Sequence, residues 1–324
     1  MIEGLHGAVT VARGNSCVLQ ESAGMADTRI GAACTPRTAF QIASVSKQFA
    51  AAAILLLSEK GSLYPDDPIG NWLTRCRREW QQITIHNLLT HTSGVGHWDD
   101  FPDLDLYSPI APAKQLSILQ RAPLRSLPGR AWRYSSPGYV LLARIVEQAS
   151  GQSYASFLTN YIIEPLNLHS TSVGEPRAEH LAACGHDNGA AVSSFDLRTA
   201  CTGAGDIWST TEDLARFNAT LCAGSFLTSK ARQAMFTAHA LLPGLTIPEG
   251  GHLLGAASYG YGWYIGTLAG HPAYFHPGDN PGYQALNVWL PQQGTSIAIL
   301  VNEQSDNVYQ LLEQLLPSAL GRRH

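Results

Sequence analysis

One stretch, FQIASVSKQFAAAAILLLSEK at residues 40–60, constrains the fold of this 324-residue chain more than any other. Apolar residues occupy every face of the predicted helix between residues 50 and 57, as expected of a helix buried inside a larger protein. Ser44 and Lys47 lie three residues apart near its start, so the helical spacing places both side chains on one face. An unpaired lysine on a buried helix loses its charge by lowering its pKa.

A serine and a lysine in this arrangement can form a nucleophile and its base. Free serine is a poor nucleophile, and an adjacent lysine of lowered pKa activates it. Backbone N–H groups at a helix start can also stabilise an oxyanion. The S-x-x-K pattern occurs once in the chain. In the alternative interpretation Ser44 is a helix cap and Lys47 a first-turn surface lysine, because so short a motif often matches by chance.

Composition excludes several classes of protein. The net charge of −4 gives no basic surface for nucleic acid, and the apolar run at residues 49–57 is too short for a membrane span. Six cysteines without C-x-x-C spacing favour free thiols in a reducing compartment. The twelve histidines show neither H-x-x-x-H nor H-E-x-x-H spacing, so we expect no metal and no cofactor. The opening MIEGLHGAVTVARG resembles no secretory signal, which favours a cytoplasmic protein.

The order of predicted elements favours an α+β fold. Period-two patterns predict strands at residues 7–13 and 18–25, and again at 261–267, 273–276, 282–290 and 296–301. Helices are predicted between them, at residues 84–94, 114–121, 138–149, 154–163 and 211–222, and at 307–316, where Pro317 should stop the last one. We therefore predict an antiparallel sheet built from both chain termini and flanked by helices, with an inserted all-helical lobe. Residues 1–324 would form one domain, with an α/β lobe at about 1–70 and 205–324 and a helical lobe at about 71–204.

Two more motifs complete a pattern with Ser44 and Lys47. Tyr134-Ser135-Ser136 is a Y-x-N-like triplet before a predicted helix, and His276-Pro277-Gly278 is an H-x-G triplet on a predicted strand. In order and spacing the chain resembles class C β-lactamase-like serine hydrolases, relatives of penicillin-binding proteins that include esterases, D-aminopeptidases and acyltransferases. The resemblance extends over nearly the whole chain, through segments such as LLTHTSG, PGYVLLARIVEQASG, EPLNLHST, GDIWSTTEDLARF, YGYGW and HPGDNPGY.

The resemblance implies a β-lactamase/transpeptidase-like fold and a role for each motif. Ser44 would be the nucleophile, and Lys47 and Tyr134 would share a proton as a coupled pair, in which the Lys47 ammonium favours a Tyr134 phenolate. The N–H groups of Ser44 and Asp279 would form the oxyanion hole. The expected substrate-binding residues are Ser136, Trp263, His276, Gly278 and Asp279. No G-x-S-x-G elbow is complete, which argues against an α/β-hydrolase.

Two departures from the family pattern bear on the substrate. Ser136 replaces an amide that would bind the side chain of a lactam, and His276 replaces the K-T-G lysine that attracts a carboxylate. Both changes weaken recognition of a penicillin. The loop at residues 95–112 adds acidic side chains, which would repel anions if they face the cleft and would otherwise form a solvated surface: Asp99, Asp100, Asp103 and Asp105.

The sequence predicts a serine hydrolase that cleaves an ester or amide of a small neutral or cationic substrate, with little β-lactamase activity. The alternatives are a biosynthetic acyltransferase, a D-amino-acid peptidase or β-lactamase, and a non-catalytic penicillin-binding-like sensor. Several aromatic residues could line an acceptor site for acyl transfer, although such residues more often belong to a core. They are Trp98, Phe101, Trp132, Trp263 and Tyr264. No nucleic-acid or membrane partner is expected, and the oligomeric state stays open.

Overall fold

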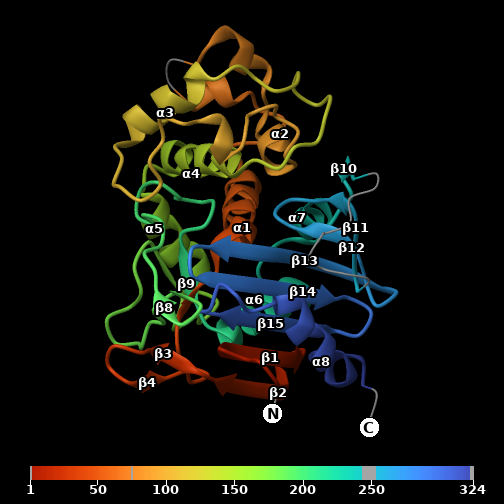
Figure 1. Cartoon of the computed structure of the whole chain (residues 1–324). Coiled ribbons are helices and arrows are strands. Elements are labelled where there is room, and N and C mark those ends of the chain that lie inside the picture. Colours follow the sequence, from red (N-terminus) through yellow and green to blue (C-terminus); the bar gives the residue numbers. More distant parts are fainter. Residues whose placement is uncertain (1, 74–75, 243–252, 322–324) are drawn as a thin grey trace.

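The central sheet joins the two ends of the chain. The computed structural model describes residues 2–73, 76–242 and 253–321. Its main sheet has the strand order β10-β11-β12-β13-β14-β15-β1-β2, and all neighbours are antiparallel (Figure 1). The strands are β1 Gly7–Arg13, β2 Ser16–Ala23, β10 Ala240–Leu241, β11 Leu254–Tyr259, β12 Tyr264–Leu268, β13 His271–Asn280, β14 Tyr283–Leu290 and β15 Thr295–Val301. Pairing of β1 with β15 confirms the predicted antiparallel sheet built from both termini.

Helices flank the sheet and form the region at the top of Figure 1. The α-helices are α1 Ser46–Glu59, α2 Ile85–Leu89, α3 Pro112–Arg121, α4 Ser136–Ser150, α5 Tyr154–Leu158, α6 Thr211–Ala223, α7 Ser229–Met235 and α8 Val308–Leu320. Short helical turns are η1 Ala43–Val45, η2 Ile69–Asn71, η3 Arg78–Gln82, η4 Trp98–Asp100 and η5 Thr159–Ile163. The arrangement confirms the predicted α+β fold with inserted helices.

Three small sheets lie outside the main one. They are built from β3 Met25–Asp27, β4 Ala32–Ala33, β5 Phe40–Gln41, β6 Ser172–Val173, β7 His186–Asp187, β8 Ala190–Ala191 and β9 Ile207–Ser209. The sheet β5-β9-β6 ties the residues before α1 to those before α6. This sheet therefore fixes the direction in which the chain enters α1.

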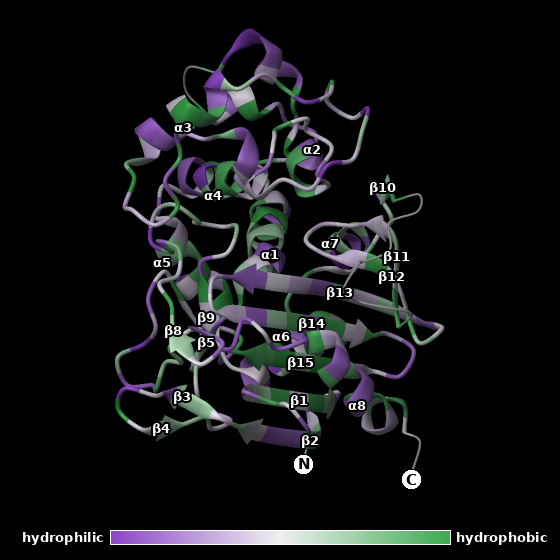
Figure 2. Cartoon of the chain, in the orientation of Figure 1, coloured by the Kyte–Doolittle hydropathy of each residue, from purple (hydrophilic) through white to green (hydrophobic). Residues whose placement is uncertain are grey.

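The central strands alternate between two buried faces. Val9, Ile297 and Ile299 pack in the core that contains α8, whereas Ala8 and Leu300 belong to the core that contains α1 and α6. Successive residues of a strand point to opposite faces, so strands covered on both sides are apolar at nearly every position. In Figure 2, β14 and β15 are accordingly among the more hydrophobic parts of the ribbon.

Helix α1 is the buried helix that its apolar residues predict. All of its residues from Ser46 to Leu55 are buried, and it packs against α4 between the sheet and the upper helices (Figure 1). Within the three described ranges, no helix combines the length and the apolar character that a membrane span requires.

Of the differences between the structure and the sequence prediction, three have a clear physical reason. The stretch 40–60 begins as strand β5 and turn η1, because β5 pairs with β9 and α1 starts only at Ser46. Pro317 does not stop the last helix. It lies in the final turn, and α8 continues to Leu320 and ends at Gly321 with a φ of 72°. Strand β11 was not predicted, since its sequence LGAASY is rich in glycine and alanine, which have low strand propensity.

Candidate active site

Ser44 lies in the tight turn that leads into α1. The Ile42 N–H donates to the Ile207 carbonyl at 2.9 Å, which anchors the turn to β9. Ala43 has a φ of 47°, in the left-handed region that non-glycine residues rarely adopt. Such strain persists only where the surrounding structure enforces it, and it concentrates at functional sites. The fold therefore holds Ser44 in one defined position.

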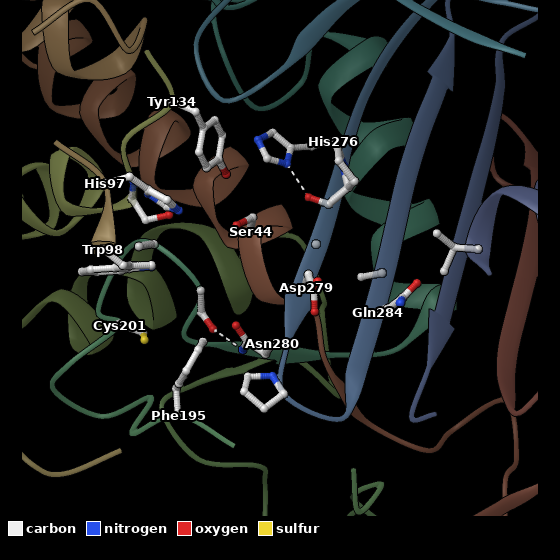
Figure 3. A pocket seen from close by; sticks show the side chains of 18 of the residues that line it. Ser44, His97, Trp98, Tyr134, Phe195, Cys201, His276, Asp279, Asn280 and Gln284 are labelled. Atoms are coloured by element: carbon white, nitrogen blue, oxygen red, sulfur yellow. Dashed lines mark hydrogen bonds between the residues drawn. The ribbon is translucent and has the colours of Figure 1, made fainter. Parts of the chain in front are cut away.

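Strand β13 passes directly beside this turn. A Cβ atom at Gly278 would lie 2.4 Å from the Ile42 carbonyl oxygen and 3.2 Å from the Ser44 nitrogen. No side chain fits in that space, so glycine is required for the close approach. The backbone of β13 and the backbone of Ser44 thus border the same pocket (Figure 3).

Lys47 lies behind Ser44 and is completely buried. Its Nζ atom is 2.9 Å from Ser44 Oγ and donates to the Ala204 carbonyl at 2.7 Å. Burial lowers the pKa of Lys47 to about 7, although the charge of Asp206 opposes this shift. At neutral pH much of Lys47 is therefore the free amine, whose lone pair can accept the hydroxyl hydrogen of Ser44.

Tyr134 lies over Lys47 on the segment before α4. The Lys47 Nζ atom is 5.0 Å from the centre of the Tyr134 ring. Burial raises the pKa of the Tyr134 phenol well above its usual value, and a hydrogen bond to Ser44 offsets this only in part. The prediction of a Tyr134 phenolate is therefore wrong. Tyr134 stays protonated at neutral pH because desolvation penalises its anion.

Two histidines hold the segment that contains Tyr134. The Ser135 N–H donates to His91 Nδ1 at 3.1 Å, and the Ser136 N–H donates to His97 Nδ1 at 3.2 Å. Burial lowers the pKa of both rings, to about 4 for His97. Both rings are therefore neutral at pH 7, which leaves Nδ1 free to accept a backbone hydrogen.

The side chains around Ser44 enclose a pocket of about 570 Å³. Tyr134 and His97 lie on one side of it and strand β13 lies on the other (Figure 3), and Ser136 also lines the pocket. Among the described residues that line the pocket, Asp279 carries the one formal charge, and none is lysine or arginine. The pocket is therefore neutral apart from a single carboxylate.

The family follows from comparison with known proteins. A model of the Beta-lactamase family matches residues 3–316. The chain belongs to the beta-lactamase family. This confirms the predicted family, and with it the predicted class of serine hydrolases.

Two beta-lactamase-family relatives illustrate the range of similarity. The chain is 29% identical over 326 residues to the putative penicillin-binding protein PbpX of Bacillus subtilis, with 96% of this chain and 76% of the relative covered. It is 34% identical over 206 residues to esterase EstB of Burkholderia gladioli, with 56% of this chain and 51% of the esterase covered.

Solved structures share the fold of this beta-lactamase-family chain. The octameric penicillin-binding protein homologue from Pyrococcus abyssi superposes with a TM-score of 0.84 at 23% identity, covering 98% of this chain and 73% of that chain. The D-amino acid amidase from Ochrobactrum anthropi SV3 gives a TM-score of 0.82 at 22% identity, covering 96% of this chain and 94% of the amidase. At these identities the match supports the fold alone.

His276 lies in the pocket wall but has no free ring nitrogen. Its Nδ1 donates to the Pro277 carbonyl at 2.6 Å, so its Nε2 accepts from the Tyr259 hydroxyl at 3.0 Å. Burial lowers the pKa of His276 to about 3, and the Lys47 charge adds to the effect. His276 therefore offers no cation where other beta-lactamase-like proteins have a lysine, and the expected substrate contact is limited to its ring surface.

Trp263 is the predicted site residue that the structure places elsewhere. Its side chain is completely buried and packs on Phe236, with ring centres 5.5 Å apart, and it does not line the pocket. The period-two pattern that suggested strand β12 did not reveal which face the tryptophan takes. Of the other aromatic candidates, Trp98 and Tyr264 line the pocket, whereas Phe101 and Trp132 do not.

The acidic loop does not charge the pocket. Asp100 forms ion pairs with Arg125 at 2.5 Å and with Arg133 at 3.0 Å. It also accepts the His97 N–H at 2.9 Å, which shapes turn η4. Asp99, Asp103 and Asp105 are absent from the pocket lining. The carboxylates of the loop are thus neutralised or solvated, and they leave Asp279 as the one acid beside Ser44.

Sequence reasoning missed His91, His97 and Asp206. His91 lies inside the LLTHTSG segment and Asp206 inside GDIWST, so the family resemblance marked their neighbourhoods. The acceptor role of an imidazole nitrogen toward a distant backbone N–H leaves no sequence signal. Within the described ranges, no three His, Cys, Asp or Glu side chains are placed to hold a metal ion.

Proposed function

We propose that this chain hydrolyses an ester or amide bond through an acyl-enzyme on Ser44. The observation that carries the proposal is the 2.9 Å contact between Ser44 Oγ and the buried, pKa-lowered Nζ of Lys47. A serine with a neutral amine at hydrogen-bond distance is an activated nucleophile.

In acylation, Ser44 Oγ bonds to the substrate carbonyl carbon and its proton passes to Lys47 Nζ. The N–H groups of Ser44 and Asp279 are proposed to bind the oxyanion, which the close packing of Gly278 on the Ser44 turn supports. Tyr134 then gives its phenolic proton to the leaving group and recovers one from Lys47. Its raised pKa suits this role, because Tyr134 is protonated when the leaving group needs an acid.

In deacylation, a water molecule attacks the acyl carbonyl. Its proton passes to the amine of Lys47, and the bond to Ser44 Oγ breaks as the Lys47 ammonium returns a proton to the serine oxygen. Lys47 therefore serves as the base in both half-reactions, and no cofactor takes part in the proposed chemistry.

We propose a neutral or cationic acyl substrate, with weak or no β-lactamase activity. No lysine or arginine lines the described pocket, and both ring nitrogens of His276 are engaged, so a substrate carboxylate meets no cation. Asp279 would repel it. The relative named as an esterase supports a small ester as the substrate.

Two further proposals concern the chain as a whole. The first is that the chain forms one catalytic domain, with an α/β lobe at about 1–70 and 205–324 and a helical lobe at about 71–204. This division fits the pocket, which lies between η1, β13 and the segment before α4. A cytoplasmic location fits the free thiols of the described cysteines. These are Cys17, Cys34, Cys76, Cys184 and Cys201.

Intact-protein mass spectrometry tests the proposed function. The wild type is incubated with p-nitrophenyl butyrate and, separately, with a penicillin, beside Ser44→Ala and the exposed control Ser62→Ala. We expect an acyl adduct from the ester in the wild type and in Ser62→Ala, and none in Ser44→Ala. An equal adduct in Ser44→Ala would move the nucleophile elsewhere, and faster turnover of the penicillin than of the ester would refute the proposed substrate class.

A further inference from the structure

The two ring nitrogens of His97 have different surroundings. Nδ1 accepts the Ser136 N–H at 3.2 Å, so in the neutral ring the hydrogen is on Nε2. No hydrogen bond to Nε2 is formed by the residues that the structure describes. The ring lines the same pocket as Ser44 and points into it beside Tyr134 (Figure 3). His97 therefore presents a fixed N–H donor to the pocket.

Two other side-chain donors in the pocket wall, on Asn280 and His276, are already engaged. Asn280 Nδ2 donates to the Gln41 side chain at 2.9 Å and to the Gly205 carbonyl at 3.1 Å. His276 uses its one ring hydrogen on the Pro277 carbonyl. The Nε2–H of His97 thus lies on the η4 side of the pocket, opposite strand β13.

The neighbours of His97 describe the group that would bind there. Trp98 and Phe195 line the pocket on the same side and offer apolar surface (Figure 3). A fixed donor beside apolar surface orients a ligand that brings an oxygen acceptor next to an apolar group, because a buried donor left without an acceptor loses its hydrogen bond to water.

We propose that His97 is a specificity-determining residue whose Nε2–H donates to an amide or other carbonyl oxygen in the acyl part of the substrate. The preferred acyl groups would resemble N-acylamino acids, which carry such an oxygen close to the scissile carbonyl. The inference rests on the proposed acyl-enzyme function and deepens it. The lowered pKa of His97, about 4, keeps the ring in the required neutral form over the working range of a neutral-pH hydrolase.

Two substitutions separate the roles of the two nitrogens. His97→Asn places its amide oxygen near the position of Nδ1, where it can still accept the Ser136 N–H, and removes the donor at Nε2. His97→Gln places its amide nitrogen near Nε2 and restores a donor. Each variant and the wild type are assayed with the p-nitrophenyl esters of N-acetylglycine and of butyric acid, which share a leaving group and have acyl chains without charge.

We expect the ratio of kcat/KM values for the two esters to favour N-acetylglycine in the wild type. In His97→Asn this ratio should fall about 3- to 10-fold, the effect of one neutral hydrogen bond, and His97→Gln should recover most of it. The ratio is measured within each variant, so a smaller folded fraction cancels. An unchanged ratio in His97→Asn, or an equal loss with both esters, overturns the inference. If neither ester acylates the wild type, the proposed function fails and the inference fails with it.

Discussion

The contact between β13 and the Ser44 turn makes Gly278→Ala a sharp test of the proposed oxyanion hole. The added Cβ would lie 2.4 Å from the Ile42 carbonyl oxygen, whereas ordinary van der Waals contact begins near 3.4 Å. The nearest contact is a backbone oxygen and the other two are the Ala43 Cβ and the Ser44 nitrogen, so no flexible side chain can rotate away. Relief requires that β13 and η1 separate by about 1 Å, and a displacement of that size at a reacting centre costs on the order of 100-fold in rate.

The expected result is a folded protein with a specific loss of catalysis. We expect kcat/KM for a p-nitrophenyl ester to fall about 100-fold, since the Ser44 and Asp279 N–H groups no longer converge on one oxygen. Overpacking should also lower the free energy of unfolding by about 1–3 kcal/mol, as insertions into packed regions do. Stopped-flow release of p-nitrophenolate and urea unfolding measure the two effects separately.

A matched glycine in the same sheet supplies the control. A Cβ at Gly255 in β11 would meet only the Thr267 side-chain oxygen at 3.3 Å, so Gly255→Ala should keep nearly full activity. If Gly278→Ala folds and retains wild-type kcat/KM, then β13 does not supply half of the oxyanion hole. The proposed role of the Asp279 N–H would have to be abandoned.

Two further predictions concern proton transfer. Because Lys47 must be neutral to accept the Ser44 proton, kcat/KM should rise with pH through an apparent pKa of about 7. Burial also raises the pKa of Asp206 to about 7, and the ionised form of Asp206 raises the pKa of Lys47, so the two groups titrate as a coupled pair. Asp206→Asn removes the ionisable partner and should move the limb to lower pH, and a pH–rate profile that keeps its position in this variant contradicts the coupling. Tyr134→Phe should slow acylation by an anilide about 100-fold, because the anilide nitrogen must be protonated as it leaves. Acylation by a p-nitrophenyl ester should slow much less, because p-nitrophenolate departs without an acid. Equal losses of rate on both substrates would show that Tyr134 does not protonate the leaving group.

Much of the fold was predictable because the relevant signals are local. The apolar run of α1 and the nearly continuous apolar stretches of β14 and β15 reflect burial on all sides, and the structure confirms the predicted helix and both strands. Spacing also brought Ser44 and Lys47 together. The first turn of the helix was misjudged because pairing of β5 with β9 depends on residues more than 160 positions apart in the sequence.

The finer chemistry of the site depends on contacts that a sequence does not encode locally. His276 is neutral and fully engaged only because Tyr259 and the Pro277 carbonyl reach its two nitrogens. Asp100 adds no unpaired charge to the pocket because Arg125 and Arg133, from the segment between α3 and α4, pair with it. Residue type alone therefore predicted the composition of the site, but not which of its polar atoms stay free.

Burial explains how two groups with similar ordinary pKa values divide into a base and an acid. Lysine and tyrosine titrate within about half a unit of each other in water, so neither is a better proton acceptor by nature. Desolvation penalises the charged form of each, which lowers the pKa of Lys47 to about 7 and raises that of Tyr134. The same dry environment thus separates the two values in opposite directions and assigns the roles. A change that admits water behind Ser44 should bring the two pKa values together and reduce catalysis without touching either group.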